Sequence, residues 1–214
     1  MDTYIFDFDG TLANSGETGI LATQAAFEEF NLPWPDRETI IYYMGIPIEV
    51  SFKKMALPHT FYGTEFEDLL SCFRAYYKRF ETSHLHLFPE TQEVLQQLKK
   101  AQKHLYVVSS KHSSSLARNL EQLDIAQYFD GIIGSDDVHH YKPAPDGILF
   151  ILERFRRNEK TTLMIGDAVF DLQMGQAAHV KTCGVTWGAH SKTELQQAHP
   201  DFLISVMREL LKIK

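Results

Sequence analysis

The stretch TYIFDFDGT, residues 3–11, consists of a short apolar run over residues 3–8 with two acids at its end, Asp7 and Asp9. This run predicts a short buried β-strand. In an extended strand, side chains two residues apart point to the same side, so the two carboxylates are predicted to start out cofacial. Gly10 then allows a sharp exit that brings the backbone close to a ligand. Paired acids need a positive counterion or a retained proton, so this segment is predicted to have a chemical rather than a structural role.

The length and composition are those of a globular α/β protein. A chain of 214 residues with 44% hydrophobic residues is long enough for one elaborated domain or two modest ones. The formal net charge is −7, from 21 basic and 28 acidic residues, and no run of lysine or arginine stands out. This charge disfavours binding to nucleic acid or to an anionic membrane surface. No pattern indicates an oligomeric state.

Cysteine usage and the N-terminus favour a cytoplasmic location. Cys72 and Cys183 lie far apart and form no metal-binding or redox motif, so both are interpreted as reduced packing residues. The first apolar run is too short for a secretion signal and lacks a basic segment before it. No apolar stretch approaches the roughly 20 residues that a membrane-spanning helix needs.

Further strand-like segments alternate with helical patterns along the rest of the chain. They cover residues 104–109, 131–134, 161–166 and 180–185. Such alternation predicts βαβ units and a parallel sheet that is covered on both faces. The predicted fold is therefore an α/β, Rossmann-like core of three αβα layers.

A different stretch, residues 15–83, interrupts this alternation and has almost no strand signal. Ser15 is a plausible N-cap for a helix through Phe30, and a second helix is predicted over residues 64–80 with a Thr64–Glu67 capping box. The block is too long for a simple crossover. We therefore predict an all-helical domain, residues 15–83, inserted into a core made of residues 1–14 and 84–214.

The reactive side chains of the chain fall where predicted strands end. In open parallel sheets, ligands bind beyond the carboxyl ends of the strands. The side chains at these ends, with one in a nearby loop, are Asp7, Asp9, Ser109, Ser110, Asp167 and Lys142. Carboxylates suit Mg²⁺, and a lysine with a metal can neutralise a phosphoryl group in transit. The set predicts phosphoryl transfer, with a carboxylate as a possible nucleophile.

Short motifs in a fixed order carry a family resemblance. Residues 7–12 (DFDGTL), 107–111 (VVSSK), 142–145 (KPAP) and 166–171 (GDAVFD) resemble the motifs of the haloacid dehalogenase-like (HAD) phosphohydrolase superfamily. One such motif could arise by chance, but all of them in this order are highly specific. The nearest likeness is to the phosphoglycolate phosphatase and β-phosphoglucomutase branch, with the helical insertion where a C1 cap would lie.

The resemblance implies roles for the acids. Asp7 would be the nucleophile that attacks phosphorus and forms an aspartyl-phosphate. Asp9 would be the general acid for the leaving oxygen and then the base for water. Mg²⁺ would be held by Asp7, the backbone carbonyl of Asp9, and Asp167. From the residues alone, a carboxyl near other negative charge, and not itself on the metal, is the one expected to retain a proton.

The resemblance also implies how phosphate is bound. Ser109, with Ser110 beside it, would contact a phosphoryl oxygen, and Lys142 would pair with that oxygen and with Asp7. Asp171 would be a supporting carboxylate that orders a metal-bound water or Lys142. The implied activity is Mg²⁺-dependent hydrolysis of a small phosphomonoester, and the implied partner is a small phosphorylated metabolite.

Other activities remain open at this level. Dehalogenases would lack the second acid, Asp9. A phosphonoacetaldehyde hydrolase would need a lysine near Gly45, and none stands at the expected place. A β-phosphoglucomutase-type mutase uses the same acid pair, but Glu49 and its apolar neighbours replace the expected cap cations. A non-catalytic phosphate-sensing module is the alternative of another class.

The remaining candidates are weaker. His84 and His86 have no third soft ligand nearby, so surface positions are expected. Lys111 and His112 follow the second motif, and contact with substrate or with solvent is equally consistent with the pattern. Trp187 is expected to pack rather than to bind a ligand.

Overall fold

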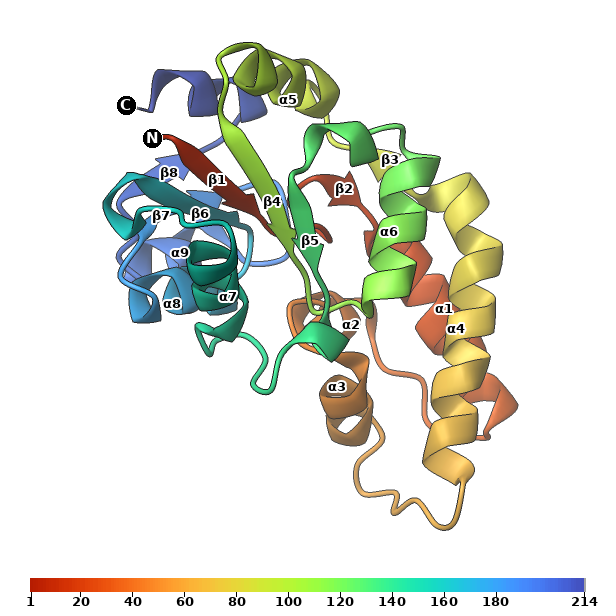
Figure 1. Cartoon of the computed structure of the whole chain (residues 1–214). Coiled ribbons are helices and arrows are strands. Elements are labelled where there is room, and N and C mark those ends of the chain that lie inside the picture. The colour runs from red at the N-terminus through yellow and green to blue at the C-terminus, as the bar shows by residue number, and fades with distance from the viewer. Residues whose placement is uncertain (214) are drawn as a thin grey trace.

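A computed structural model describes residues 1–213, which form a six-stranded sheet with the strand order β5-β4-β1-β6-β7-β8 (Figure 1). Every neighbouring pair in this sheet is parallel. The strands are β1 (Thr3–Phe6), β4 (His104–Val108), β5 (Gly131–Ile133), β6 (Thr162–Gly166), β7 (Lys181–Val185) and β8 (Phe202–Ile204). The predicted α/β fold is confirmed, with β1 at the centre of the sheet.

Strand alternation along β1 explains the three layers. Tyr4 and Phe6 belong to one apolar cluster, which also holds Leu95 of helix α5 (Thr91–Lys100). Ile5 points to the other face and packs in a second cluster with Ile148. The helices of the core are α5, α6 (Ser113–Gln122), α7 (Asp146–Arg154), α8 (Val169–Ala177) and α9 (Lys192–Gln197), with 3-10 turns at Ala126–Tyr128, Ser135–Asp137, Glu159–Thr161 and Met207–Lys212.

Two strand predictions differ from the structure. The first strand ends at Phe6, so Asp7 and Asp9 lie in the loop that follows it, and strand alternation does not set their directions. The edge strand β8 was not predicted. This strand has only three residues, which follow Pro200 and Asp201. Such a run is too short for its periodicity to identify a strand.

The segment between the first two core strands is helical, as predicted. It contains α1 (Gly16–Glu29), α2 (Arg37–Tyr43), α3 (Ile48–Met55) and α4 (Glu65–His84), which lie to the right of and below the sheet in Figure 1. We call these helices the helical insertion. Helices α1, α3 and α4 share an apolar cluster of their own, built around Phe27, Phe52 and Phe73. A short antiparallel pair, β2 (Ala13–Asn14) with β3 (His86–Leu87), joins the two ends of this segment.

The predicted helix caps are wrong in detail. Ser15 precedes α1, but its side chain makes no capping hydrogen bond and its hydroxyl is buried without a partner among residues 1–213. Thr64 precedes α4, yet its hydroxyl donates to Asp68 at 2.8 Å rather than forming the box with Glu67. The backbone of Thr64 (φ −91°, ψ 1°) departs from the extended conformation usual at an N-cap, which explains the lost geometry.

Two further expectations can be compared with the structure. Both cysteines are free, Cys183 buried and Cys72 half-buried. Among residues 1–213, no helix combines the length and the apolar character that crossing a bilayer requires.

Candidate active site

Asp7 lies at the carboxyl end of β1 and is paired with a buried lysine. The Nζ atom of Lys142 lies 2.5 Å from Asp7 Oδ1 and 2.8 Å from Asp171 Oδ1. The three side chains are at most 6% exposed. Lys142 comes from the loop before α7 and Asp171 from the first turn of α8, so the sheet brings together residues more than a hundred positions apart.

Asp167 follows β6 and is held by two donors. The Thr11 hydroxyl donates to Oδ1 at 2.7 Å, and the Ala189 amide donates to Oδ2 at 2.7 Å. Gly10 has a positive φ of 85°, and a Cβ atom there would collide with the Asp167 carboxylate. A glycine at this position therefore lets the loop after β1 approach Asp167 closely.

Asp171 supports both the helix and the lysine. Its Oδ2 accepts a hydrogen bond from the Ala168 amide at 3.0 Å, one of the free donors at the start of α8. Its Oδ1 contacts Lys142 but makes no well-formed hydrogen bond, although it is fully buried. The carboxylate is therefore only partly satisfied by the protein groups around it.

The site holds more negative than positive charge. Burial, opposed in part by Lys142 and reinforced by the other acids, raises the pKa of Asp7 well above its usual value. Burial and repulsion from Asp171 raise the pKa of Asp167 to about 7. For Lys142, burial opposes the charged form, but attraction to Asp171 and Asp7 outweighs it, so its pKa is raised.

These residues fit a hard divalent cation. Oxygen atoms of Asp7, Asp167 and Asp171 lie within 4.8 Å of one another and are buried. Carboxylate oxygens are the ligands that Mg²⁺ prefers, and a cation would offset the excess negative charge and engage the partly satisfied Asp171 Oδ1. The family resemblance implied Asp7, Asp167 and the carbonyl of Asp9 as metal ligands and gave Asp171 a supporting role, whereas in the structure Asp171 lies as close to the cluster as the other two acids. The metal ligands stay predictions.

Asp9 faces a different environment from Asp7. Its Oδ1 lies 3.3 Å from Lys111 Nζ and accepts a hydrogen bond from the Tyr77 hydroxyl at 3.4 Å. Lys111 also lies over the Tyr77 ring, 4.0 Å from its centroid. Burial opposes the charge of Lys111, but Asp9 and Tyr77 raise its pKa overall. The two acids of the first motif thus have separate partners. Asp7 belongs to the cluster of buried carboxylates with Asp167 and Asp171, and Asp9 contacts Tyr77 of the helical insertion.

The two predicted phosphate-binding serines point to different partners. Ser109 follows β4, is buried, and accepts a hydrogen bond from the Lys111 amide at 3.1 Å. Ser110 donates to the Gly45 carbonyl of the helical insertion at 3.0 Å. Ser110 therefore joins the core to the insertion in this structure, and phosphate contacts by either serine stay a prediction.

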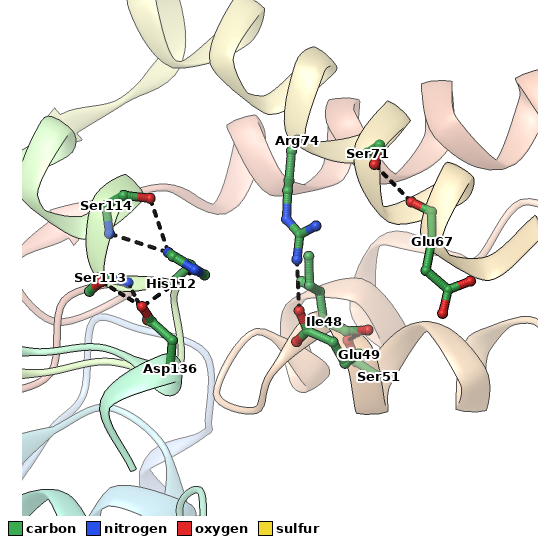
Figure 2. Close-up of polar contacts among 10 residues, drawn as sticks. All are labelled: Ile48, Glu49, Ser51, Glu67, Ser71, Arg74, His112, Ser113, Ser114 and Asp136. Carbon is green, nitrogen blue, oxygen red and sulfur yellow. Dashed lines mark hydrogen bonds and ion pairs between the residues drawn. The ribbon is translucent and has the colours of Figure 1, made fainter. Parts of the chain in front are cut away.

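A pocket opens beside Asp9, between the helical insertion and the start of α6. Its cavity has a volume of about 100 Å³. Residues of α2, α3, α4 and the 44–46 turn line one side, and Ser110, Lys111 and His112 line the other. Figure 2 shows the two sides, with Arg74 and Glu49 on the insertion and His112 at the start of α6.

Sequence reasoning missed or left open several residues around this pocket. Tyr77 belongs to a stripe of apolar residues at helical spacing along α4, which predicts packing and cannot reveal that the Tyr77 hydroxyl reaches Asp9. The stripe consists of Phe66, Leu69, Leu70, Phe73, Tyr77 and Phe80. Lys111 was left open between substrate and solvent, and the structure places it against Asp9. Trp187 packs against Phe88 as expected, and its indole also donates to the Thr11 carbonyl at 3.1 Å.

Comparison with known proteins identifies similar sequences over nearly the whole chain. The profile of the family described as haloacid dehalogenase-like hydrolase matches residues 4–185. The chain is 33% identical over 213 residues to the probable phosphatase IndB of Dickeya dadantii, covering 97% of this chain and 90% of that protein. It is 29% identical over 211 residues to the pyrophosphatase PpaX of Oceanobacillus iheyensis, covering 99% and 95%.

Solved structures share the fold. The crystal structure of a predicted phosphoglycolate phosphatase from Haemophilus somnus superposes with a TM-score of 0.93 and covers 99% of this chain and 97% of that one. The two sequences are 24% identical, so this likeness concerns the fold alone. The family resemblance drawn from the motifs and the predicted fold class are both confirmed.

Proposed function

The chain belongs to the haloacid dehalogenase-like hydrolase family, and on this premise we propose that it is a Mg²⁺-dependent phosphatase that acts on a small phosphomonoester. The observation that carries the proposal is the separation of the two first-motif acids. Asp7 lies in a buried cluster with Lys142, beside Asp167 and Asp171, and Asp9 lines the adjoining pocket. This separation supports a role for Asp7 in attack on phosphorus and for Asp9 at the leaving group.

Asp7 is the proposed nucleophile. A carboxylate oxygen of Asp7 bonds to phosphorus, and the bond between phosphorus and the ester oxygen breaks. Lys142 already contacts Asp7 Oδ1, so it can orient that carboxylate and neutralise charge on the phosphoryl group. Ser109, buried at the end of β4, is the proposed hydrogen-bond donor to a phosphoryl oxygen.

Asp9 is the proposed general acid and base. It gives its proton to the departing alcohol oxygen, and in the second step it takes a proton from the water that attacks the phosphorus of the aspartyl-phosphate. That step releases inorganic phosphate and restores Asp7. Tyr77 and Lys111 contact Asp9 Oδ1 and can hold its carboxyl toward the pocket.

A bound Mg²⁺ would be held by Asp7, Asp167 and the Asp9 carbonyl, with Asp171 close enough to take part. Its contribution would be to offset the negative charge of the carboxylates and of the phosphoryl group. Thr11 and the Ala189 amide keep Asp167 oriented for this role.

We further propose that the helical insertion, residues 15–83, acts as a cap over a catalytic core of residues 1–14 and 84–214. Contacts from Tyr77 to Asp9, from Ser110 to Gly45 and from Arg118 to Glu81 support a closed arrangement. A cap that closes would exclude bulk water from the phosphoenzyme and present contacts to the leaving group.

The experiment uses p-nitrophenyl phosphate, whose leaving group is stable as an anion and does not require protonation. Wild-type protein should release nitrophenolate continuously with Mg²⁺ and lose this activity with a chelator. Asp7→Asn should lower turnover by at least about 10⁴-fold, since the nucleophile is removed. Asp9→Asn should release about one nitrophenolate per chain and then stall, because the phosphoenzyme forms but is not hydrolysed.

Asp68→Asn, which changes an exposed acid on α4, is the matched control and should retain full turnover. Turnover that persists in Asp7→Asn would refute the nucleophile. Phosphoryl transfer to an added sugar phosphate, with little release of inorganic phosphate, would instead indicate a mutase.

A further inference from the structure

The pocket beside Asp9 is apolar on the side that the helical insertion provides. Met44, Ile46, Ile48, Phe52 and Met55 line it there. Apolar side chains cannot replace the water that solvates a highly charged group, and burying such a group without partners is costly. The insertion side therefore favours a leaving group with an apolar surface.

The arginines that line the pocket are already paired. Arg74 Nη2 lies 2.8 Å from Glu49 Oε1, an ion pair between α4 and α3 that Figure 2 shows. Arg118 donates to both oxygens of Glu81, at 2.8 and 3.0 Å. Glu49 also lines the pocket and would repel an anion. Neither arginine thus offers an unopposed positive charge to a polyanionic substrate.

Lys111 differs from both arginines in being more buried and in pairing with Asp9 rather than with a glutamate. Its side chain is only 12% exposed, and within residues 1–213 Asp9 is the one carboxylate within ion-pairing distance, at 3.3 Å. Its ammonium also lies over the rings of Tyr77 and Phe8, 4.0 and 5.8 Å from their centroids. The pocket therefore offers one buried cation, next to the position where the leaving oxygen would depart.

We infer that the substrate is the phosphomonoester of an organic alcohol that has an apolar surface and no more than one anionic group, which Lys111 binds. Inorganic pyrophosphate, whose leaving group is itself a phosphate, fits this pocket poorly. The inference rests on the proposed phosphatase function. It assigns to this chain a substrate class different from the one that the name of the PpaX relatives gives.

The test compares kcat/KM, with Mg²⁺ present, for three probes: phenyl phosphate, 3-carboxyphenyl phosphate and pyrophosphate. The two aryl esters share the apolar ring and differ by one carboxylate. Both should exceed pyrophosphate by at least about tenfold, and the carboxylated ester should exceed phenyl phosphate by about tenfold, the value of one charge-assisted hydrogen bond.

Two variants separate the contributions of charge and apolar surface. Lys111→Met should bring the ratio of carboxyphenyl to phenyl phosphate close to one, and this ratio cancels any general loss of activity. Ile48→Lys, which adds a cation to the apolar side, should raise the ratio of pyrophosphate to phenyl phosphate by about tenfold, and Ile48→Met should leave it unchanged.

Pyrophosphate hydrolysed as well as the aryl esters would overturn the inference and leave the phosphatase proposal intact. An unchanged ratio in Lys111→Met would overturn the assignment of the anionic group to that lysine. Failure to hydrolyse any of the three probes would instead contradict the phosphatase proposal on which the inference rests.

Discussion

Two neighbouring regions of this protein, each built around an aspartate of the first motif, are stabilised in opposite ways. Around Asp7, buried charges contact one another directly, and one lysine serves two carboxylates. Around the pocket beside Asp9, apolar side chains dominate, and the arginines are neutralised by glutamates of the insertion. The first region comes from loops at the edge of the sheet, and the second is completed by helices.

The two regions can divide chemistry from selectivity. The carboxyl ends of parallel strands lie at one edge, so the buried charges near Asp7 depend on the core alone. The pocket depends on residues from both the core and the insertion, so its shape can change when the insertion sequence changes. Variants in the first region should therefore affect all substrates equally, and variants in the second should affect them selectively.

Among the variants that compare the two regions, the largest effect is expected from Lys142→Met. It removes the only cation that contacts Asp7 and Asp171 among residues 1–213, and kcat/KM should fall by about 10³-fold for every phosphoester. Steady-state kinetics with two unrelated esters measures this. Lys160→Met, an exposed position, is the control and should match wild type. A loss confined to one ester would contradict the division between the two regions.

The acids near Asp7 should make metal-free stability depend on pH. The pKa of Asp167 is raised from 3.8 to about 7, so the folded state binds more protons than the unfolded state between these values. Its contribution is fully present below pH 4 and is lost as the pH rises to about 7. The loss, on the order of a few kcal/mol, should be seen by urea unfolding in the presence of a chelator.

Mg²⁺ should counteract this loss at pH 7.5, by about 2.7 kcal/mol at a concentration 100 times its dissociation constant. Asp167→Asn should both flatten the pH dependence and remove the stabilisation by Mg²⁺. If the variant retains the wild-type response to Mg²⁺, Asp167 is not part of the metal site.

Glu81→Ala should weaken the connection between the insertion and the core. Glu81 is buried, and Arg118 and Asn119 of α6 donate to its carboxylate. Burial raises its pKa, but the bonds to these two residues outweigh that effect and lower it. Removing the carboxylate should cost about 2–3 kcal/mol of unfolding free energy, toward the low end for a buried pair because Arg118 is partly exposed.

Chemical denaturation measures the effect of Glu81→Ala. Glu17→Ala removes the exposed pair with Arg37 and should cost much less. Equal losses in the two variants would show that burial does not distinguish these ion pairs.

The smallest effect is expected from Ser110→Ala, which removes the hydrogen bond from its hydroxyl to the Gly45 carbonyl. One neutral hydrogen bond contributes about 1 kcal/mol, so kcat/KM should fall roughly fivefold. Ser71→Ala removes a similar bond, 2.8 Å long, within α4 (Figure 2), and should leave kinetics unchanged. A loss of more than about 10²-fold in Ser110→Ala would favour direct phosphate binding by Ser110.

Much of the fold was predictable because its signals are local. The apolar runs at residues 104–109 and 161–166 predict buried strands from their composition alone. In the structure, most of their residues are buried. The grouping of Asp7, Asp167 and Lys142 was predictable from one general rule, since parallel strands end at the same edge. The edge strand β8 was not predictable, because a run of three residues leaves no distinctive pattern.

The parallel core, the position of the helical insertion and the reactive groups at the strand ends could be derived from the amino-acid sequence, because the pattern that predicts each involves residues close together along the chain. The contacts of Tyr77 and Lys111 with Asp9, and of Ser110 with Gly45, became evident only from the folded structure. The aromatic stripe of α4 looks the same in sequence whether a ring ends in the apolar core or against an acid. That outcome depends on how the insertion packs against the core. The contacts concerned join residues that are far apart in the sequence: Ser110 and Gly45 are separated by 65 positions, and Tyr77 and Asp9 by 68.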